Sequence, residues 1–476
     1  MYYWCSLFIL TIILFYSVKR QYQPFILFAS SFLFIVVFSV SIALFSIVFT
    51  ILNYYLGIML EKYSNKQILK YKLFWLSIVI DVGILVFFKY FFPLFENLNS
   101  IFFSSGMYSK LPYGSIMIPV GISYYTFQAL GYLIRVDRGS EEAEHNFFAF
   151  AAFLLFFPKL LSGPVERSNH FLPQLNNHVK FSINNIESGL RLFLFGLFKK
   201  VVIADNLYGA VSSVYGGVHN FAGAPLLLVL IIQPIYIYCD FSGYTDMVLG
   251  VSKFFGIKLV NNFDRPFLAR NISEFWRRWH ISLSSWCNDY IYSSFIIKFR
   301  RWKIKAVIFG IFLTFLIVGI WHGANFTFVI LGLLQGIAIV YEFYTRRTRL
   351  KISSRFPKNL VNTLSRIFVF LFMAISMVFF FANSVKEALY LISHLFRNID
   401  FNPAEIDFIK NKPEFLIALI CFSGLFVIEI LNEKGRNLLS IYLKQPILIR
   451  CFGYLTLLLL SWLFYSGIHT FYYMRF

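Results

Sequence analysis

The sequence predicts an all-α, polytopic membrane protein, and three observations lead to this fold class. Hydrophobic residues make up 58% of the 476 positions and charged residues only 14%, whereas a soluble domain carries about 25% charged residues. Apolar stretches of roughly 20 residues, the length that crosses a bilayer, recur along the chain. Short clusters of Lys and Arg separate them, as in cytoplasmic loops. The length leaves room for about ten to thirteen spans, and we expect about 10–12. The composition excludes a disordered chain or an ordinary soluble enzyme.

The net charge of +20 comes from 43 Lys and Arg residues against 23 Asp and Glu residues. Because the basic residues fall between apolar stretches, we assign them to the cytoplasmic side and expect membrane lipid, not nucleic acid, as their neighbour. The five cysteines are scattered and show no metal-ligand spacing, so the sequence predicts neither a disulfide framework nor a metal site.

The basic clusters set the expected topology of the N-terminal part. The apolar start precedes Lys19 and Arg20, so we expect a retained first span with the N-terminus outside. The elements expected before residue 140 are a span at 1–16, two spans within 24–59 joined by a tight turn at 39–41, a span at 72–92, an outside loop at 97–114 and a returning span at 115–133.

The middle of the chain is less regular. Residues 147–158 are apolar but too short to cross, which predicts a re-entrant or protein-buried segment. Residues 183–205 mix apolar and basic side chains and predict an amphipathic helix. The apolar run 226–238 ends in a polar stretch at 239–246, and the aromatic, polar segment 261–292 predicts surface or interfacial helices that do not cross.

The C-terminal part returns to a regular pattern, and no internal repeat is visible. Expected here are spans at 306–320, 326–341, 367–382, 415–430 and 449–472, a basic inside loop at 346–358, and a C-terminus outside. We expect one integral membrane domain over residues 1–476.

Two histidines are candidates for chemistry, because ionisable groups within membrane segments are rare and usually functional. His322 lies between two apolar runs, next to the small residues Gly319, Gly323 and Ala324. From the length of the preceding run we expect it between the middle of the bilayer and its outer half. A histidine hydrogen-bonded in the bundle, or one in an outside turn, is the structural alternative.

His280 follows Trp276, Arg277, Arg278 and Trp279. Tryptophan and arginine side chains suit a helix at the membrane interface, and this structural interpretation stands beside a catalytic one. Asp240 and Tyr244 can orient a histidine or line a polar cavity, and Gln128 can line a tunnel; loop solvation and helix pairing are the alternatives. The sequence contains no GxSxG, P-loop, HExxH or GxGxxG motif, which argues against a serine hydrolase, an ATP-driven pump and a metalloprotease.

Four stretches resemble the membrane-bound O-acyltransferase (MBOAT) family, and specifically its bacterial alginate O-acetyltransferase branch. They are 118–128 (IPVGISYYTFQ), 157–167 (FPKLLSGPVER), 240–246 (DFSGYTD) with 274–286 (EFWRRWHISLSSW), and 321–325 (WHGAN), in the family's order within residues 112–342. The resemblance implies a helical bundle with re-entrant and interfacial helices around a central tunnel. It implies His322 as the buried catalytic histidine and His280 as the second family histidine. Candidate tunnel residues are Trp279, Arg278, Asp240, Tyr244, Gln128 and Trp321.

The chain departs from the family pattern at one place. After Trp286 the family usually has Arg-Asp-Tyr and a Gly-Gly turn, whereas this chain has Asn288 in place of the arginine and no Gly-Gly. This departure concerns the acceptor type or the partner surface more than the core chemistry.

The resemblance implies an O-acetyltransferase of the bacterial inner (plasma) membrane. His322 would act as general base on a hydroxyl that attacks a cytoplasmic thioester donor, acetyl-CoA or another acyl thioester, with no tightly bound cofactor. The acceptor would be an exported or cell-surface polysaccharide, reached directly or through an SGNH-type periplasmic or surface partner protein. Transfer of D-alanine to teichoic acid and a transporter or flippase without acyl transfer are the alternatives.

Overall fold

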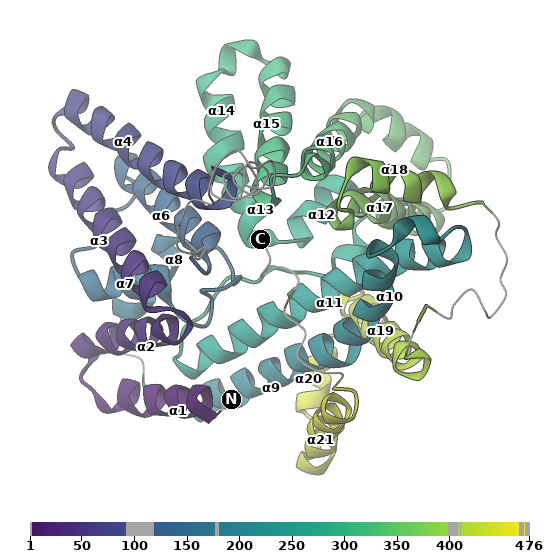
Figure 1. The fold of residues 1–476 in the computed structure, drawn as a ribbon, viewed down its shortest axis with the longest axis horizontal. Helices are drawn as coiled ribbons and strands as arrows, with labels where there is room; N and C mark the ends of the chain where they lie inside the picture. Colours follow the sequence, from purple (N-terminus) through teal and green to yellow (C-terminus); the bar gives the residue numbers. More distant parts are fainter. Residues whose placement is uncertain are drawn as a thin grey trace, which may run out of the picture. The chain divides into compact units, whose positions relative to one another are not determined.

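The helical fold expected from composition is present in the computed structural model of the chain (Figure 1). The structure describes residues 2–91, 119–176, 180–397, 408–409, 411–465 and 471. Within these residues the regular elements are helices, and the one β-bridge joins Phe263 to Trp279. The predicted outside loop at 97–114 lies outside the described residues.

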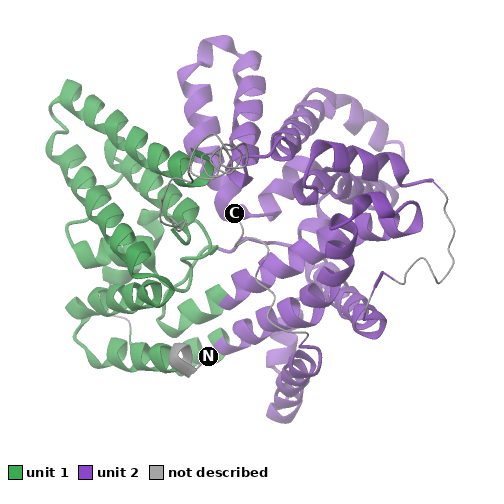
Figure 2. Ribbon diagram, viewed as in Figure 1, with its two compact units in different colours: residues 1–189, 248–260, 476 green, residues 190–247, 261–475 purple. Residues whose placement is uncertain are grey.

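Eight of the described helices are long and apolar enough to cross a membrane, and two shorter apolar helices, Ser6–Ser17 and Ile447–Leu463, accompany them. This pattern confirms an all-α polytopic membrane protein. The described residues hold eight helices long enough to cross, against the 10–12 spans predicted for the whole chain. The chain divides into two compact units (Figure 2). The prediction of a single domain over residues 1–476 stays a prediction.

Unit 1 comprises residues 1–189 and 248–260. Its helices are α1 (Tyr2–Ser17), α2 (Gln23–Phe38), α3 (Val40–Lys62), α4 (Gln67–Val86), α6 (Ile122–Asp137), α7 (Phe147–Leu155) and α8 (Ser168–Asn176). The predicted turn at 39–41 is confirmed, because Ser39 is extended and accepts a hydrogen bond from the N–H of Ile42. The short segment after residue 147 is also confirmed as buried, since every residue of α7 from Ala149 to Leu155 is buried.

Unit 2 comprises residues 190–247 and 261–475. It holds most of α9 (Ile183–Phe198) and of α11 (Ala224–Phe254). The other helices are α10 (Asp205–Tyr215), α12 (Ile272–Arg278), α13 (Ile281–Cys287), α14 (Ser293–Lys298), α15 (Ile304–His322), α16 (Phe326–Ser353), α17 (Lys358–Phe381), α18 (Val385–His394), α19 (Lys412–Glu433), α20 (Leu438–Leu443) and α21 (Ile447–Leu463).

The sequence suggested that the polar stretch at 239–246 ends the apolar helix before it, but the structure shows that the helix continues. Helix α11 runs unbroken through it for 31 residues. The acidic groups are neutralised from a π-helical turn, Lys199–Ala204: Lys199 Nζ lies 2.6 Å from Asp246 Oδ2 and Lys200 Nζ lies 2.8 Å from Asp240 Oδ1. Paired charges can be buried within a helix bundle, so no polar loop is needed.

The segment 261–292 is also different from the expectation of surface helices. It forms the short helices α12 and α13, which do not cross, but many of its side chains are buried, including Phe275, Trp279 and Trp286. The reason lies in its backbone pairing: the N–H of Asp264 donates to the carbonyl of Arg278, and that of Ile281 donates to the carbonyl of Asn262. The pairing folds the segment on itself within unit 2 and covers its aromatic residues.

Candidate functional site

His322 is the last residue of α15, and its side chain is buried, with only 5% of the residue exposed. Aromatic rings surround the imidazole: its centroid lies 4.9 Å from the ring of Trp321, 5.4 Å from Phe380 and 6.2 Å from Phe328. Asn325 then starts α16 by accepting a hydrogen bond from the N–H of Thr327. The histidine therefore lies at a helix end inside unit 2, within an aromatic environment.

Two glycines bring the backbones of α15 and α16 together beside this histidine. A Cβ atom on Gly319 would lie 2.3 Å from the carbonyl oxygen of Phe328, and one on Gly332 would lie 2.3 Å from that of Phe315. No real side chain fits at such distances, so the helices pack backbone to backbone as small residues allow in membranes. This contact fixes the end of α15 and with it the position of His322.

The imidazole of His322 lines a small cavity of about 40 Å³. Most of the wall is apolar, and it comes from α11, α12, α15, α16, α17 and the residue that follows α12; its residues are Ile237, Trp276, Trp279, Phe315, Val318, Gly319, Leu331, Gly332, Gln335, Met373, Met377 and Phe380. Gln335 is the amide of this wall, and the residue is 1% exposed. The cavity thus joins one imidazole and one amide with apolar surface.

A chain of hydrogen bonds ties three helices around this cavity. Trp276 Nε1 donates to Gln335 Oε1 at 3.1 Å, and Gln335 Nε2 donates to Ser376 Oγ at 3.0 Å. Ser376 Oγ in turn donates to the backbone carbonyl of Met373 at 3.0 Å. Since α12, α16 and α17 each contribute to this chain, the cavity wall is held by polar contacts as well as by packing.

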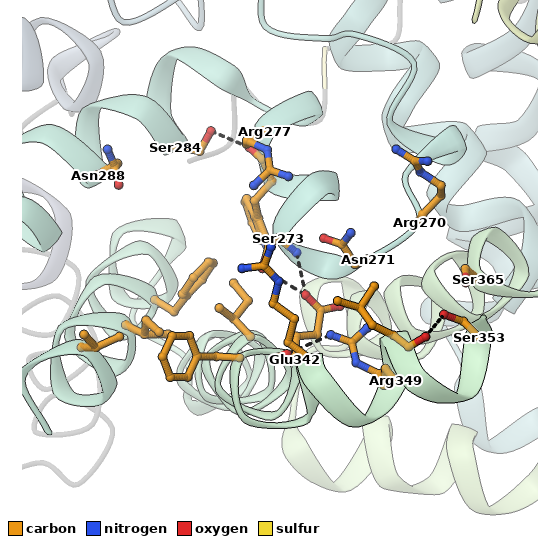
Figure 3. Close-up of a pocket in the computed structure, with 18 of the residues that line it drawn as sticks. Arg270, Asn271, Ser273, Arg277, Ser284, Asn288, Glu342, Arg349, Ser353 and Ser365 are labelled. Carbon is orange, nitrogen blue, oxygen red and sulfur yellow. Dashed lines mark hydrogen bonds between the residues drawn. The ribbon is translucent and has the colours of Figure 1, made fainter. Parts of the chain in front are cut away.

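A second, much larger pocket of about 1620 Å³ opens beside the first (Figure 3). Five basic side chains line it: Arg270, Arg277, Arg346, Arg349 and Lys358. Figure 3 shows Arg270, Arg277 and Arg349 on different sides of the pocket. The carboxylate of Glu342 also lines it, but it accepts hydrogen bonds from the N–H groups of Ile272 and Ser273. The excess of positive charge favours an anionic ligand.

The two cavities share three wall residues, Trp276, Phe315 and Val318. The rings of Trp276 and Phe315 meet edge to face with their centroids 5.2 Å apart. On α15 the large pocket is lined by Val307, Ile311, Thr314, Phe315 and Val318, which share one helix face, and His322 follows Val318 one turn later. From Val307 to His322 this face extends about 22 Å. It leads from the basic pocket to the histidine.

His280 is held in a different environment from His322. Its backbone is left-handed, with φ of 45° and ψ of 51°, which is uncommon for a residue with a side chain. The residue is 1% exposed, and burial lowers the pKa of its imidazole to about 3, so the ring is neutral at pH 7. The walls of the two cavities described above do not include it.

The ring of Trp321 contacts both histidines. The Trp321 ring centroid is 6.2 Å from that of His280 and 4.9 Å from that of His322. The ring of His280 also meets that of Phe241 edge to face, with centroids 4.9 Å apart. The two candidate histidines therefore belong to one aromatic cluster in unit 2, with His322 at the small cavity and His280 behind Trp321.

The structure separates the remaining tunnel candidates. Trp279 lines the small cavity with His322. Arg278 pairs with Glu274 and Glu433, and Asp240 pairs with Lys200. The Tyr244 ring lies 5.0 Å from that of Phe471. Gln128 belongs to unit 1, where it is buried and accepts a hydrogen bond from Lys159. The roles assigned to these side chains, and the tunnel itself, stay predictions.

Sequence reasoning missed several residues of the site. Gln335 is an amide inside an apolar run, which is a recognisable signal for function. Met373 and Met377 carry no such signal, because methionines spaced by four residues are ordinary in an apolar helix. Trp276 lies in the stretch 274–286 that resembles a family motif, but only the fold shows that it lines both cavities.

Comparison with known proteins places these features in a family. Residues 22–385 match the family described as "MBOAT, membrane-bound O-acyltransferase family". The chain is 33% identical to a probable alginate O-acetylase, AlgI, of Pseudomonas aeruginosa over 375 residues, which cover 79% of this chain and 70% of that protein. It is 35% identical to a peptidoglycan O-acetyltransferase of Helicobacter pylori, over 72% of this chain and 67% of that protein. A teichoic acid D-alanyltransferase of Bacillus subtilis is 30% identical to this chain, over 48% of this chain and 60% of the length of that protein.

Proposed function

This chain belongs to the membrane-bound O-acyltransferase family and is a multi-pass bacterial membrane acyltransferase; we propose that it moves an acetyl group from a cytoplasmic thioester to a hydroxyl of an exported or cell-surface polysaccharide. The similar proteins named for alginate O-acetylation and peptidoglycan O-acetylation support a polysaccharide acceptor. The observation that carries the proposal is the small, largely apolar cavity that His322 lines next to a large basic pocket.

The basic pocket suits the phosphorylated part of a donor such as acetyl-CoA. Arg277, Arg346 and Arg349 supply planar guanidinium groups, which bind phosphate oxygens in pairs. The residues between 346 and 358 form the cytoplasmic side in the topology predicted above, which is where a thioester donor is made. The acyl end would then reach past Trp276, Phe315 and Val318 toward His322.

His322 is proposed as the general base. Its imidazole would take the proton of the acceptor hydroxyl while the hydroxyl oxygen forms a bond to the thioester carbonyl carbon. The carbon–sulfur bond then breaks, and the leaving thiolate receives the proton from the imidazolium. The products are an O-acetyl ester and a free thiol. Aromatic rings around the imidazole limit the access of water, which would hydrolyse the thioester.

His280 is proposed as a positioning residue for this reaction. Its neutral, buried ring packs against Trp321, the neighbour of His322, so it would keep the orientation of His322 without taking a proton itself. An SGNH-type partner protein outside the cell would accept the acetyl group on a serine and pass it to the polysaccharide. This relay is part of the proposal.

The variant His322→Gln tests the proposed base. It keeps the size and polarity of the side chain but cannot take up a proton, so transfer should fall by about 10²–10⁴-fold. The measurement is the acetate released by mild base from the surface polysaccharide of cells that carry the wild-type or the variant chain. Replacement of His219, an exposed residue of the short 3-10 helix Val218–Asn220, by Gln is the control. The amount of folded protein is compared by size-exclusion chromatography.

Three results would count against the proposal. If the folded His322→Gln variant released as much acetate as the wild type, His322 would not be the general base. Release of D-alanine in place of acetate would indicate the alternative of teichoic acid modification. A polysaccharide whose export, and not its acetylation, depends on His322 would indicate a transporter.

A further inference from the structure

The small cavity at His322 has the dimensions of a very short acyl group. On the scale of its 40 Å³, one water molecule needs roughly 10–15 Å³. The space therefore holds about three groups the size of a water, which corresponds to the methyl, carbonyl carbon and oxygen of an acetyl group. A propionyl group, longer by one methylene, would exceed this volume.

Helix α17 closes this cavity with three side chains. Met373, Met377 and Phe380 line it and are 2%, 6% and 7% exposed. Met373 and Met377 are one helical turn apart, so they present neighbouring side chains to the same space. Because methionine is unbranched and adaptable, it fills such a wall closely.

Polar contacts keep this wall in place. The carbonyl of Met373 accepts from Ser376, which accepts from Gln335, which accepts from Trp276. A wall that is tied at its backbone relaxes little when a side chain is shortened, so removing atoms there leaves a larger cavity. The wall residues include no carboxylate, and the oxygen of Gln335 already accepts from Trp276, so burying an ammonium in this space would be unfavourable.

We propose that Met373 and Met377 set the acyl specificity of the enzyme, limiting the donor to acetyl and rejecting longer or charged acyl groups. The inference rests on the proposed function, because it assigns the acyl end of the donor to the cavity at His322. The inference goes beyond the proposed base, because it names residues that select the acyl group of the donor.

The experiment compares acetyl-CoA with propionyl-CoA and butyryl-CoA as competing donors for membranes that contain the full chain. The acetyl, propionyl and butyryl esters formed on the acceptor polysaccharide are quantified by mass spectrometry. In Met373→Ala and Met377→Ala the ratio of propionyl to acetyl transfer should rise by about 10–200-fold over wild type, the range that one methylene contributes to discrimination. The milder replacements Met373→Val and Met377→Val should shift the ratio in the same direction. They replace the alanine variants in the experiment if those do not fold.

The matched control is Ile375→Ala, on the same helix between the two methionines. Ile375 is 41% exposed and does not line the cavity, so the donor ratio should stay at the wild-type value. A wild-type ratio in all folded Met373 and Met377 variants, or an equal shift in Ile375→Ala, would overturn the inference. If the wild-type chain transfers no acetyl group at all, the proposed function itself fails, and this result is distinguishable from an unchanged ratio.

Discussion

The His280 side chain is surrounded by groups that keep it neutral. Its ring meets Phe241 and Trp321, and the nearby Arg278 pairs with Glu274 and Glu433. The residue is the N-cap of α13 in a left-handed conformation, which is uncommon for a non-glycine residue and typical of functional or tightly constrained positions. Burial therefore lowers the pKa of the imidazole to about 3, against an ordinary value near 6.5.

This shift predicts a loss of stability in mild acid. Below about pH 6.5 the unfolded chain binds a proton at His280 that the folded chain does not, so the free energy of unfolding decreases as the pH falls from 6.5 toward 3. Between pH 6.5 and pH 5 the loss from this residue is at most about 2 kcal/mol. The measurement is the unfolding midpoint of the purified protein between pH 7 and pH 5.

The variant His280→Asn provides the comparison. Asparagine tolerates the left-handed conformation but does not titrate, so the midpoint of this variant should vary less with pH than that of the wild type. Equal slopes in the two proteins would contradict the assignment of the acid sensitivity to His280.

At the scale of elements, the contact between α15 and α16 is the feature on which the site depends. Gly319 and Gly332 let the two backbones meet, and the contact lies one turn before His322. A methyl group on Gly319 would require a backbone shift, because it would lie 2.3 Å from a carbonyl oxygen. The same shift would move the end of α15 relative to Phe328 and Phe380.

Replacement of Gly319 by Ala should therefore destabilise the protein by about 1–3 kcal/mol and reduce acyl transfer. Gly424 on α19 is a matched control, since a Cβ atom there would meet nothing within 4 Å. Gly424→Ala should be neutral or stabilising by up to about 1 kcal/mol, because alanine favours the helix. Thermal unfolding of both variants checks the prediction, and an equal effect at the two glycines would refute it.

At the scale of the whole molecule, the basic loops predict the orientation of the chain in the membrane. Ser64, in the exposed turn between α3 and α4, and Ser354, after α16, lie among Lys and Arg residues and should face the cytoplasm. Ser393 near the end of α18 follows α17, so it should face the other side.

Single cysteines at Ser64, Ser354 and Ser393, in a chain without its native cysteines, test this orientation. A membrane-impermeant maleimide should label Ser393→Cys in intact spheroplasts, and it should label Ser64→Cys and Ser354→Cys only after the membrane is opened. Labelling of all three positions from one side would invalidate the topology and the cytoplasmic entry of the donor.

Much of the fold could be predicted, because a span in lipid is recognised by its length and composition. The break at Ser39, the short buried helix after residue 147 and the helix that ends at His322 all follow from local pattern. The pattern failed at Asp240 and Asp246, whose partners Lys199 and Lys200 lie about 40 residues earlier in the chain. It also failed at 261–292, where backbone pairing buries aromatic residues that resemble an interfacial helix.

The sequence by itself determined the class of the protein, its helices and the two histidines at which to look for chemistry, since hydropathy and motif residues are properties of neighbouring positions. Only the tertiary structure decided that His322 lines a cavity with Gln335, Met373 and Met377 while His280 lies behind Trp321. Cavities and their sizes arise where α12, α15, α16 and α17 pack together, and residues as distant in the chain as Trp276 and Phe380 meet there. Packing between such distant segments leaves no mark in the local pattern of either.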